Sequence, residues 1–124
     1  MFGKIKLRRS DTLCSKYIRE LRGNKCEKCG RKGEEWKLEA SHFWGRVAES
    51  VRYDPDNIDC LCFLCHQEFH ANRKDYEKWK LQKLGRKKYD LLEMRKYQYK
   101  KKDEKLAIMY VLELLKELKN TIEI

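Results

Sequence analysis

The chain has 124 residues, a length that suits one domain with a modest core. Its 30 Lys and Arg residues against 20 Asp and Glu residues give a formal net charge of +10. This excess favours a polyanionic partner, with nucleic acid the first candidate, although the charged residues could instead only keep surface helices in solution. No stretch approaches the roughly 18 apolar residues of a membrane span, and the first residues contain no signal-peptide core. We therefore expect a cytoplasmic protein with no membrane contact.

The first predicted elements are a helix and a strand. Residues 10–23 contain an apolar stripe at helical spacing, and Ser10 and Asp11 are good N-cap residues in front of it. After a turn-rich knuckle, residues 35–43 roughly alternate between apolar and polar side chains, which predicts a strand. The apolar residues expected on one face of this strand are Trp36, Leu38 and Ala40.

The second half of the chain is predicted to be mostly helical. A loop that ends in a turn at Pro55 leads to a short strand at 58–61 and then to a helix that starts near Phe63. Asn72 can cap a further helix that Gly85 ends, and two more helices follow. The apolar side chains expected on the buried sides of the helices after Asn72 include Tyr76, Trp79, Leu81, Leu84, Tyr89, Leu91, Leu92 and Met94.

Four of the six cysteines form two CxxC pairs with 32 residues between them. Zinc takes four thiolate or imidazole ligands in a tetrahedron, and one tight turn lets a CxxC pair supply two of them. A redox pair, an iron–sulfur cluster and unrelated thiols are the alternatives, but two pairs at this separation favour a structural zinc. The predicted zinc ligands are Cys26, Cys29, Cys62 and Cys65. We expect Cys14 and Cys60 to be small buried side chains.

The three histidines of the chain form a second pattern. His42 ends the first predicted strand, and His66 and His70 lie one turn apart on the same face of the helix beside the zinc. Asn57 lies in the turn between the strand and that helix.

This order of histidine, asparagine and histidine resembles the HNH endonucleases that carry a zinc site. More narrowly, the stretches "ASHFWGR" and "VRYDPDNIDCLCFLCHQEFHANRKDYEKWKLQKLG" resemble the phage recombination nucleases of the NinG/Rap type. The resemblance implies an α+β fold: a small zinc-stapled treble-clef, or ββα-metal, finger with flanking helices and a long C-terminal helix. We expect a single domain over 1–124, with an N-terminal helix in 1–24, the zinc-stapled core in 25–72 and a basic helical extension in 73–124.

The resemblance also implies an activity and its residues. It points to a metal-dependent DNA endonuclease that acts on branched or junction DNA in a prokaryotic or phage-infected cell. His42 would be the general base, His66 and His70 would hold a catalytic Mg²⁺ or Mn²⁺, and Asn57 would hold the loop or orient His42. A neutral imidazole suits the base near pH 7. The alternative is a zinc-knuckle protein that binds DNA without cutting it.

One position departs from the family pattern. Many members carry Asp or His directly before the base as another metal ligand, and this chain has Ser41, whose hydroxyl is a poorer ligand than a carboxylate. Ser41 stays a candidate ligand, together with acids nearby in the sequence. These acids are Glu39, Asp54, Asp56 and Asp59.

Basic residues after the predicted base are expected to contact the phosphates of DNA, which predicts low sequence specificity. Trp44 and Tyr53 could stack on bases or close the core, and the apolar stripe of the last helix could pack on its own domain or form a homodimer. The expected DNA contacts are Arg46, Arg52, Lys74, Lys78, Arg86, Lys87, Lys88, Arg95, Lys96, Lys100, Lys101 and Lys102.

Overall fold

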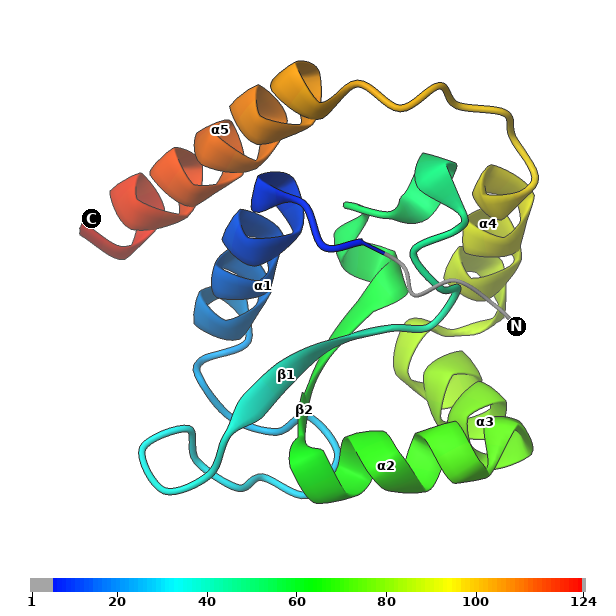
Figure 1. Ribbon diagram of the computed structural model, residues 1–124. Coiled ribbons are helices and arrows are strands. Elements are labelled where there is room, and N and C mark those ends of the chain that lie inside the picture. The colour runs from blue at the N-terminus through cyan, green and yellow to red at the C-terminus, as the bar shows by residue number, and fades with distance from the viewer. Residues whose placement is uncertain (1–5, 124) are drawn as a thin grey trace.

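Two short antiparallel strands lie at the centre of the computed structural model, which describes residues 6–123 (Figure 1). Strand β1 (Leu38–His42) pairs with strand β2 (Ile58–Cys62), so that His42 lies opposite Ile58. Every residue of β2 is buried, as expected for a strand with helices packed on it. Helices α1 (Arg9–Leu21) and α2 (Phe63–Ala71) both pack against the two strands. The α+β fold predicted from the sequence is therefore present.

Helices α2, α3 (Arg73–Leu84) and α4 (Arg86–Lys96) follow one another with very short connections. The Asn72 side chain accepts a hydrogen bond from the backbone N–H of Asp75 at 3.3 Å, so it caps α3 as predicted. Gly85 ends α3 with a φ of +83°, a conformation that glycine adopts without steric cost. These two residues turn the chain so that the helices pack around one aromatic cluster.

The aromatic cluster centres on Phe43, the residue after β1, which is 1% exposed. The rings of Trp44, Tyr76 and Tyr89 lie edge-on to it, with centroids 5.0 to 5.8 Å away. Phe69 stacks on Tyr76 at 4.6 Å and joins α2 to α3. The end of β1 is therefore packed against three helices.

A buried polar network lies beside this cluster. The Asp59 carboxylate accepts hydrogen bonds from the Lys80 ammonium at 2.7 Å, from Lys83 at 2.6 Å and from the Tyr76 hydroxyl at 2.6 Å. Burial raises the pKa of Asp59, but the two ammonium groups outweigh this effect and lower it. Ser41 joins the network through a 2.9 Å hydrogen bond with the Tyr76 hydroxyl.

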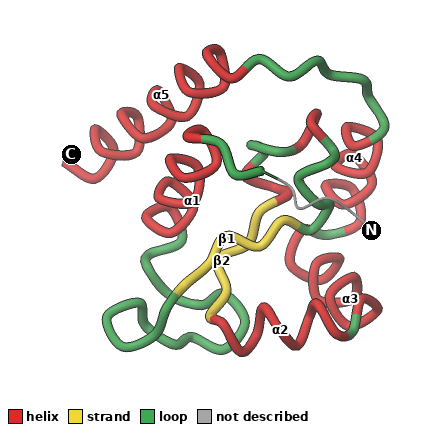
Figure 2. Tube along the Cα trace, viewed as in Figure 1, coloured by secondary structure: helices red, strands yellow, loops and turns green. Residues whose placement is uncertain are grey.

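Helix α5 (Glu104–Glu123) packs along α1, after a linker that runs as an extended trace from the end of α4 (Figures 1 and 2). Ala107 and Val111 are buried in this contact. The apolar stripe of α5 thus covers its own domain, while Leu106, Met109 and Leu112 stay exposed. None of the described helices is both long and apolar enough to cross a membrane.

Some sequence-based expectations about these elements are corrected. Trp36 precedes β1 and is 42% exposed, because the turn before the strand extends further than predicted. Leu91 and Met94 are exposed, since α4 buries only a narrow face around Leu92. Helix α1 begins one residue earlier than its expected cap, and the Asp11 carboxylate accepts from the backbone N–H of Arg8.

Candidate active site and metal centre

The four cysteines of the CxxC pairs come together from two distant segments. Cys26 and Cys29 lie in a knuckle, where the backbone N–H of Gly30 donates to the Cys26 carbonyl at 2.9 Å. Cys62 ends β2, and Cys65 lies in the first turn of α2. The four sulfur atoms all lie within 4.8 Å of one another.

This cluster fits a zinc ion. Zinc–sulfur bonds of about 2.3 Å in a tetrahedron place the sulfur atoms about 3.8 Å apart, and the Sγ atoms of Cys29 and Cys62 are 3.8 Å apart. The Arg31 guanidinium donates to both of these sulfurs, at 3.2 and 3.6 Å. Burial raises the pKa of Cys29, but hydrogen bonds from the Arg31 backbone and from the other thiols lower it to about 6. The pKa of Cys62 is lowered as well, whereas burial and hydrogen bonds with the other thiols raise that of Cys65, so Cys29 and Cys62 are the two cysteines that favour the thiolate a metal needs.

The other two cysteines lie away from this cluster. Cys14 on α1 is 2% exposed and Cys60 on β2 is fully buried. Burial raises the pKa of Cys14 to about 12 and that of Cys60 to about 11. Both thiols are therefore protonated at neutral pH and pack as small core side chains.

His42 has one ring nitrogen engaged and one free. Its Nε2 lies 2.9 Å from the backbone carbonyl oxygen of Arg52. A carbonyl only accepts, so the ring proton is on Nε2 and Nδ1 carries the lone pair. Nδ1 is buried and has no hydrogen-bond partner within residues 6–123. Burial, followed by the positive charge of Arg46, lowers the pKa of His42 from 6.5 to about 4. At neutral pH His42 is an uncharged base with its lone pair covered.

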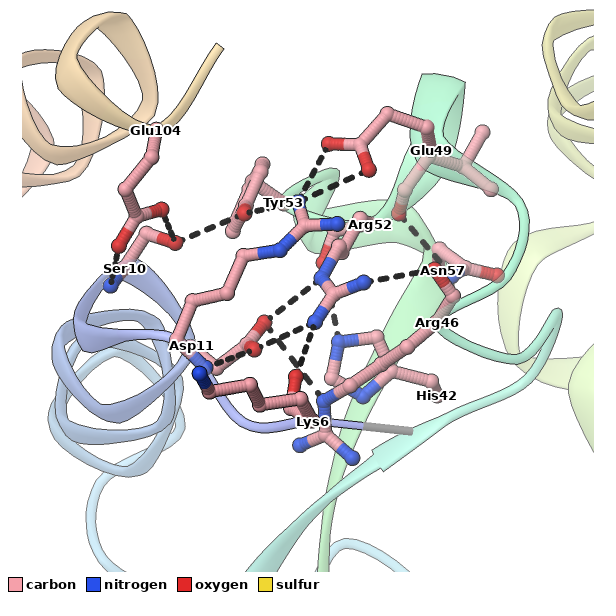
Figure 3. A network of polar contacts seen from close by, with 12 residues as sticks. Lys6, Ser10, Asp11, His42, Arg46, Glu49, Arg52, Tyr53, Asn57 and Glu104 are labelled. Atoms are coloured by element: carbon pink, nitrogen blue, oxygen red, sulfur yellow. Dashed lines mark hydrogen bonds and ion pairs between the residues drawn. The ribbon is translucent and has the colours of Figure 1, made fainter. Parts of the chain in front are cut away.

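The cover over His42 is a charged network between α1 and the loop after β1 (Figure 3). The Arg52 guanidinium is 3% exposed and donates to both oxygens of Asp11, at 2.9 and 2.6 Å. It also donates to the Arg46 and Lys6 carbonyls, at 3.1 and 3.3 Å. The Nε of Arg46 lies 3.6 Å from Asp11 and, like Nδ1 of His42, is buried with no hydrogen-bond partner in the described chain.

Asn57 holds the loop that carries Arg52. Its side-chain oxygen accepts from the Trp44 backbone N–H at 2.8 Å, and its amide donates to the Trp44 and Val51 carbonyls at 2.8 and 3.0 Å. These bonds leave no donor or acceptor of the fully buried Asn57 facing solvent. Asn57 thereby fixes the carbonyl group of Arg52 that orients His42.

His66 has a carboxylate partner. The Glu39 carboxylate lies 2.9 Å from Nδ1 of His66, which places a proton on Nδ1 and leaves Nε2 as the nitrogen that can bind a cation. His70 is exposed, one turn further along α2. The four cysteines are the only group of three or more potential metal ligands that lies close together in the described chain. His42, His66 and His70 therefore do not form a ready-made three-histidine site.

Glu39 and His66 line a cavity of about 540 Å³ beside β1. Arg46 also lines this cavity. Its side chain therefore connects the charged network around Asp11 and Arg52 with the Glu39–His66 pair. Of the acids considered as replacements for Ser41, only Glu39 contacts His66, because Asp54 and Asp56 pair with Arg95. The Asp59 and Ser41 side chains both point into the Tyr76 network.

The expected DNA contacts divide into exposed and engaged residues. The expectation that Arg52 contacts DNA is corrected, because its guanidinium is buried against Asp11. Lys80, which lies on α3 two residues after the exposed Lys78, is also buried. Arg95 is held by Asp54 and Asp56, and Lys96 lies over the Trp44 ring at 3.9 Å. The residues that stay exposed are Lys74, Lys78, Arg86, Lys87, Lys88, Lys100, Lys101 and Lys102.

Sequence reasoning missed the partnership of Asp11 with Arg52, which lies 41 residues away. It also left open the roles of Trp44 and Tyr53. The ring of Trp44 packs on Phe43, and Tyr53 is 6% exposed with its hydroxyl 2.7 Å from that of Ser10. Both aromatic residues therefore close the core around the end of β1.

Comparison with known proteins supports the resemblance to phage proteins of the NinG type. The family model described as "Bacteriophage Lambda NinG protein" matches residues 7–122, nearly the whole chain. No curated protein and no solved structure matches. A match of this extent shows the family, and the chain belongs to the bacteriophage lambda NinG protein family.

Proposed function

We propose that this protein is a metal-dependent DNA endonuclease with a structural zinc, acting on branched DNA in phage recombination. The observation that carries the proposal is the state of His42. Its Nε2–H is held by the Arg52 carbonyl, and its Nδ1 keeps a lone pair with no partner in residues 6–123. A neutral histidine held in one tautomer can take the proton of the water that attacks a phosphodiester.

In the free protein this base is covered. Arg46 lies over the site and its charge helps to keep the pKa of His42 near 4, too low for an efficient base at neutral pH. A phosphate group in the neighbouring cavity would attract the Arg46 guanidinium, whose Nε has no hydrogen-bond partner in the described chain. Movement of Arg46 towards the phosphate would expose Nδ1 and remove one cause of its low pKa. Arg46 would thus couple substrate binding to the uncovering of the base.

The Glu39–His66 pair fits a divalent cation that keeps open positions. The Nε2 atom of His66 alone cannot make a closed site, so the ion would take water and phosphate as its other ligands. Such an ion, Mg²⁺ or Mn²⁺, would stabilise the negative charge on the phosphate and the leaving oxygen. The role of Glu39 would be to hold the ring of His66 so that Nε2 faces the cavity. His70 would bind the ion only if helix α2 or the other ligands of the ion moved.

The exposed lysines and arginines of α3, α4 and the following linker would contact DNA phosphates, as expected for low sequence specificity. A homodimer through the exposed residues of α5 stays a prediction.

A second function is favoured by a specific observation. Nδ1 of His42 is sealed from solvent, and the only ready-made metal cluster within residues 6–123 is the cysteine cluster. Both features would also suit a zinc-knuckle protein that binds DNA without cutting it.

Cleavage by wild type and by His42→Ala separates the two functions. Linear, flapped and four-way DNA would be incubated with Mn²⁺ or Mg²⁺, and binding to the same DNA measured alongside. We expect the substitution to lower the cleavage rate by at least about 100-fold while DNA binding and zinc content are kept. If the wild type cuts no DNA form with either ion, the endonuclease proposal fails and the binding protein remains.

A further inference from the structure

The linker between α4 and α5 exposes two aromatic rings. Tyr97 is 71% exposed and Tyr99 is 90% exposed, whereas most other aromatic residues of the chain pack in the core. Large exposed apolar surfaces mark interaction sites, and the two most exposed aromatic side chains among residues 6–123 lie only two positions apart here. Since the Tyr99 ring is almost wholly in solvent, the fold itself gains very little from it.

The same linker is strongly basic. Lys100, Lys101 and Lys102 are exposed, and none of them forms an ion pair within residues 6–123. By contrast, Arg95 in the last turn of α4 is held by Asp54 and Asp56. The linker therefore starts from an anchored helix end and then presents three unpaired positive charges. Its charge and its rings together fit a ligand that has both phosphates and flat apolar faces.

The beginning of the linker is connected to the candidate active site. The Lys96 ammonium lies between two rings, 3.9 Å from the centroid of Trp44 and 4.7 Å from that of Tyr97. The Ser50 hydroxyl donates to the Lys96 carbonyl at 3.1 Å and fixes this position. Trp44 follows His42 by two residues. A strand of nucleic acid that leaves the site past Trp44 would meet Tyr97 next.

We propose that the segment Tyr97–Lys102 binds unpaired nucleotides, with bases stacked on Tyr97 and Tyr99 and phosphates bound by the three lysines. Paired bases keep their faces inside the duplex, so two exposed rings on an extended chain suit single-stranded nucleic acid better than duplex. This assignment rests on the proposed endonuclease in one respect: the nucleic acid bound by Tyr97–Lys102 is taken to be the substrate that the enzyme cuts. It then names the substrate class: DNA with a single-stranded segment next to the cleaved bond.

DNA-binding measurements test this stacking site without relying on DNA cleavage. Zinc-loaded full-length protein, with no other divalent ion, would be titrated with a single-stranded oligonucleotide carrying 2-aminopurine and with a blunt duplex of the same length. We expect Tyr99→Ala to weaken single-strand binding by about 5- to 100-fold and to leave duplex binding unchanged. Tyr99→Phe keeps the ring and should retain both affinities. Because the ring is 90% exposed, the variant should melt at the wild-type temperature.

The three lysines of the linker supply the control for the Tyr99 variants. Replacing Lys100, Lys101 and Lys102 by Gln should weaken both DNA forms, because it removes phosphate contacts alone. If Tyr99→Ala weakens single strand and duplex equally, or neither, the stacking site is overturned. A protein that binds single strands through Tyr99 but cuts no DNA would contradict the endonuclease and leave this site standing. If the protein cuts DNA and Tyr99→Ala leaves its single-strand binding unchanged, the endonuclease proposal stands and the stacking site is overturned.

Discussion

The four cysteines of the CxxC pairs and the three histidines of this chain are organised in opposite ways. The cysteines form one closed cluster, with sulfur atoms spaced for a tetrahedral ion. The histidines are dispersed: His42 lies under Arg46, His66 pairs with Glu39, and His70 faces solvent. The two sets meet at α2, where Cys65 and His66 are neighbours in the sequence.

A structural metal site and a catalytic metal site place different requirements on a fold. A structural ion is held by protein ligands alone, so all four must be in place once the chain has folded. A catalytic ion must leave positions for water and substrate, so a partial set of protein ligands is what such a site would have before substrate binds. Substitutions in the cysteine cluster and at the histidines test whether the two sites differ in this way.

The largest effect is expected at the cysteine cluster. Cys62→Ser removes one of four thiolates, and a structural zinc binds with about 10 kcal/mol or more in small domains, comparable with the whole stability of a small protein. We expect the variant to lose its zinc and its cooperative thermal unfolding, measured by metal analysis and circular dichroism. Cys60→Ser, also buried on β2, is the matched control and should keep one zinc per chain. A folded Cys62→Ser protein would refute the structural role.

A smaller effect is expected from the two helix histidines. His66→Ala removes the nitrogen that Glu39 orients, and we expect Mn²⁺ to bind at least about 10-fold more weakly to the zinc-loaded protein. His70→Ala, one turn along the same helix, should change Mn²⁺ binding by much less, since His70 has no such carboxylate partner in the described chain. Calorimetric titration with Mn²⁺ measures both. Equal losses would show that both histidines bind the ion, and no loss in either variant would contradict the proposed site.

The smallest effect is a change in titration. The pKa of His42 lies near 4, lowered first by burial and then by the charge of Arg46. The hydrogen bond to the Arg52 carbonyl and the charge of Asp11 oppose this shift, and the charge of Arg52 adds only a smaller lowering. Arg46→Ala removes a positive charge and admits water, so both changes move the pKa upwards, towards 6.5. NMR of the His42 ring between pH 5 and 7 should show a neutral ring throughout in the wild type and protonation at the lower end in the variant.

Arg46→Lys is the control for this last prediction, because it keeps the charge. Its His42 pKa should stay closer to that of the wild type. Identical titration in wild type and Arg46→Ala would mean that Arg46 does not cover the base. The pH range stays above 5 so that the zinc thiolates remain bound during the measurement.

Much of the scaffold could be predicted from local patterns. The CxxC pairs need only a tight turn each, and Asn72 and Gly85 act within one helical turn of their own positions. The same is true of the strand that ends at His42 and of the helix that starts at Phe63. In each case the deciding interaction lies within a few residues along the chain, where residue type alone is informative.

The positions of the long charged side chains could not be predicted in this way. Arg52 and Lys80 belong to the same basic pattern as the exposed lysines, yet both are buried. Each has a carboxylate partner far along the chain, Asp11 for Arg52 and Asp59 for Lys80. A charged group enters a core only when such a partner is brought to it by the fold, and no local pattern reports that event.

Residue types and their spacing were enough to predict the four cysteines of the metal cluster, the order of strand, turn and helix around His42, Asn57 and His66, and the net positive charge. The folded chain was needed to find that Glu39 is the acid beside His66 and that Arg46 lies close to His42. Residue chemistry and short spacings specify the first group. The second depends on contacts between elements that lie far apart along the chain, and these contacts exist only after the core has packed.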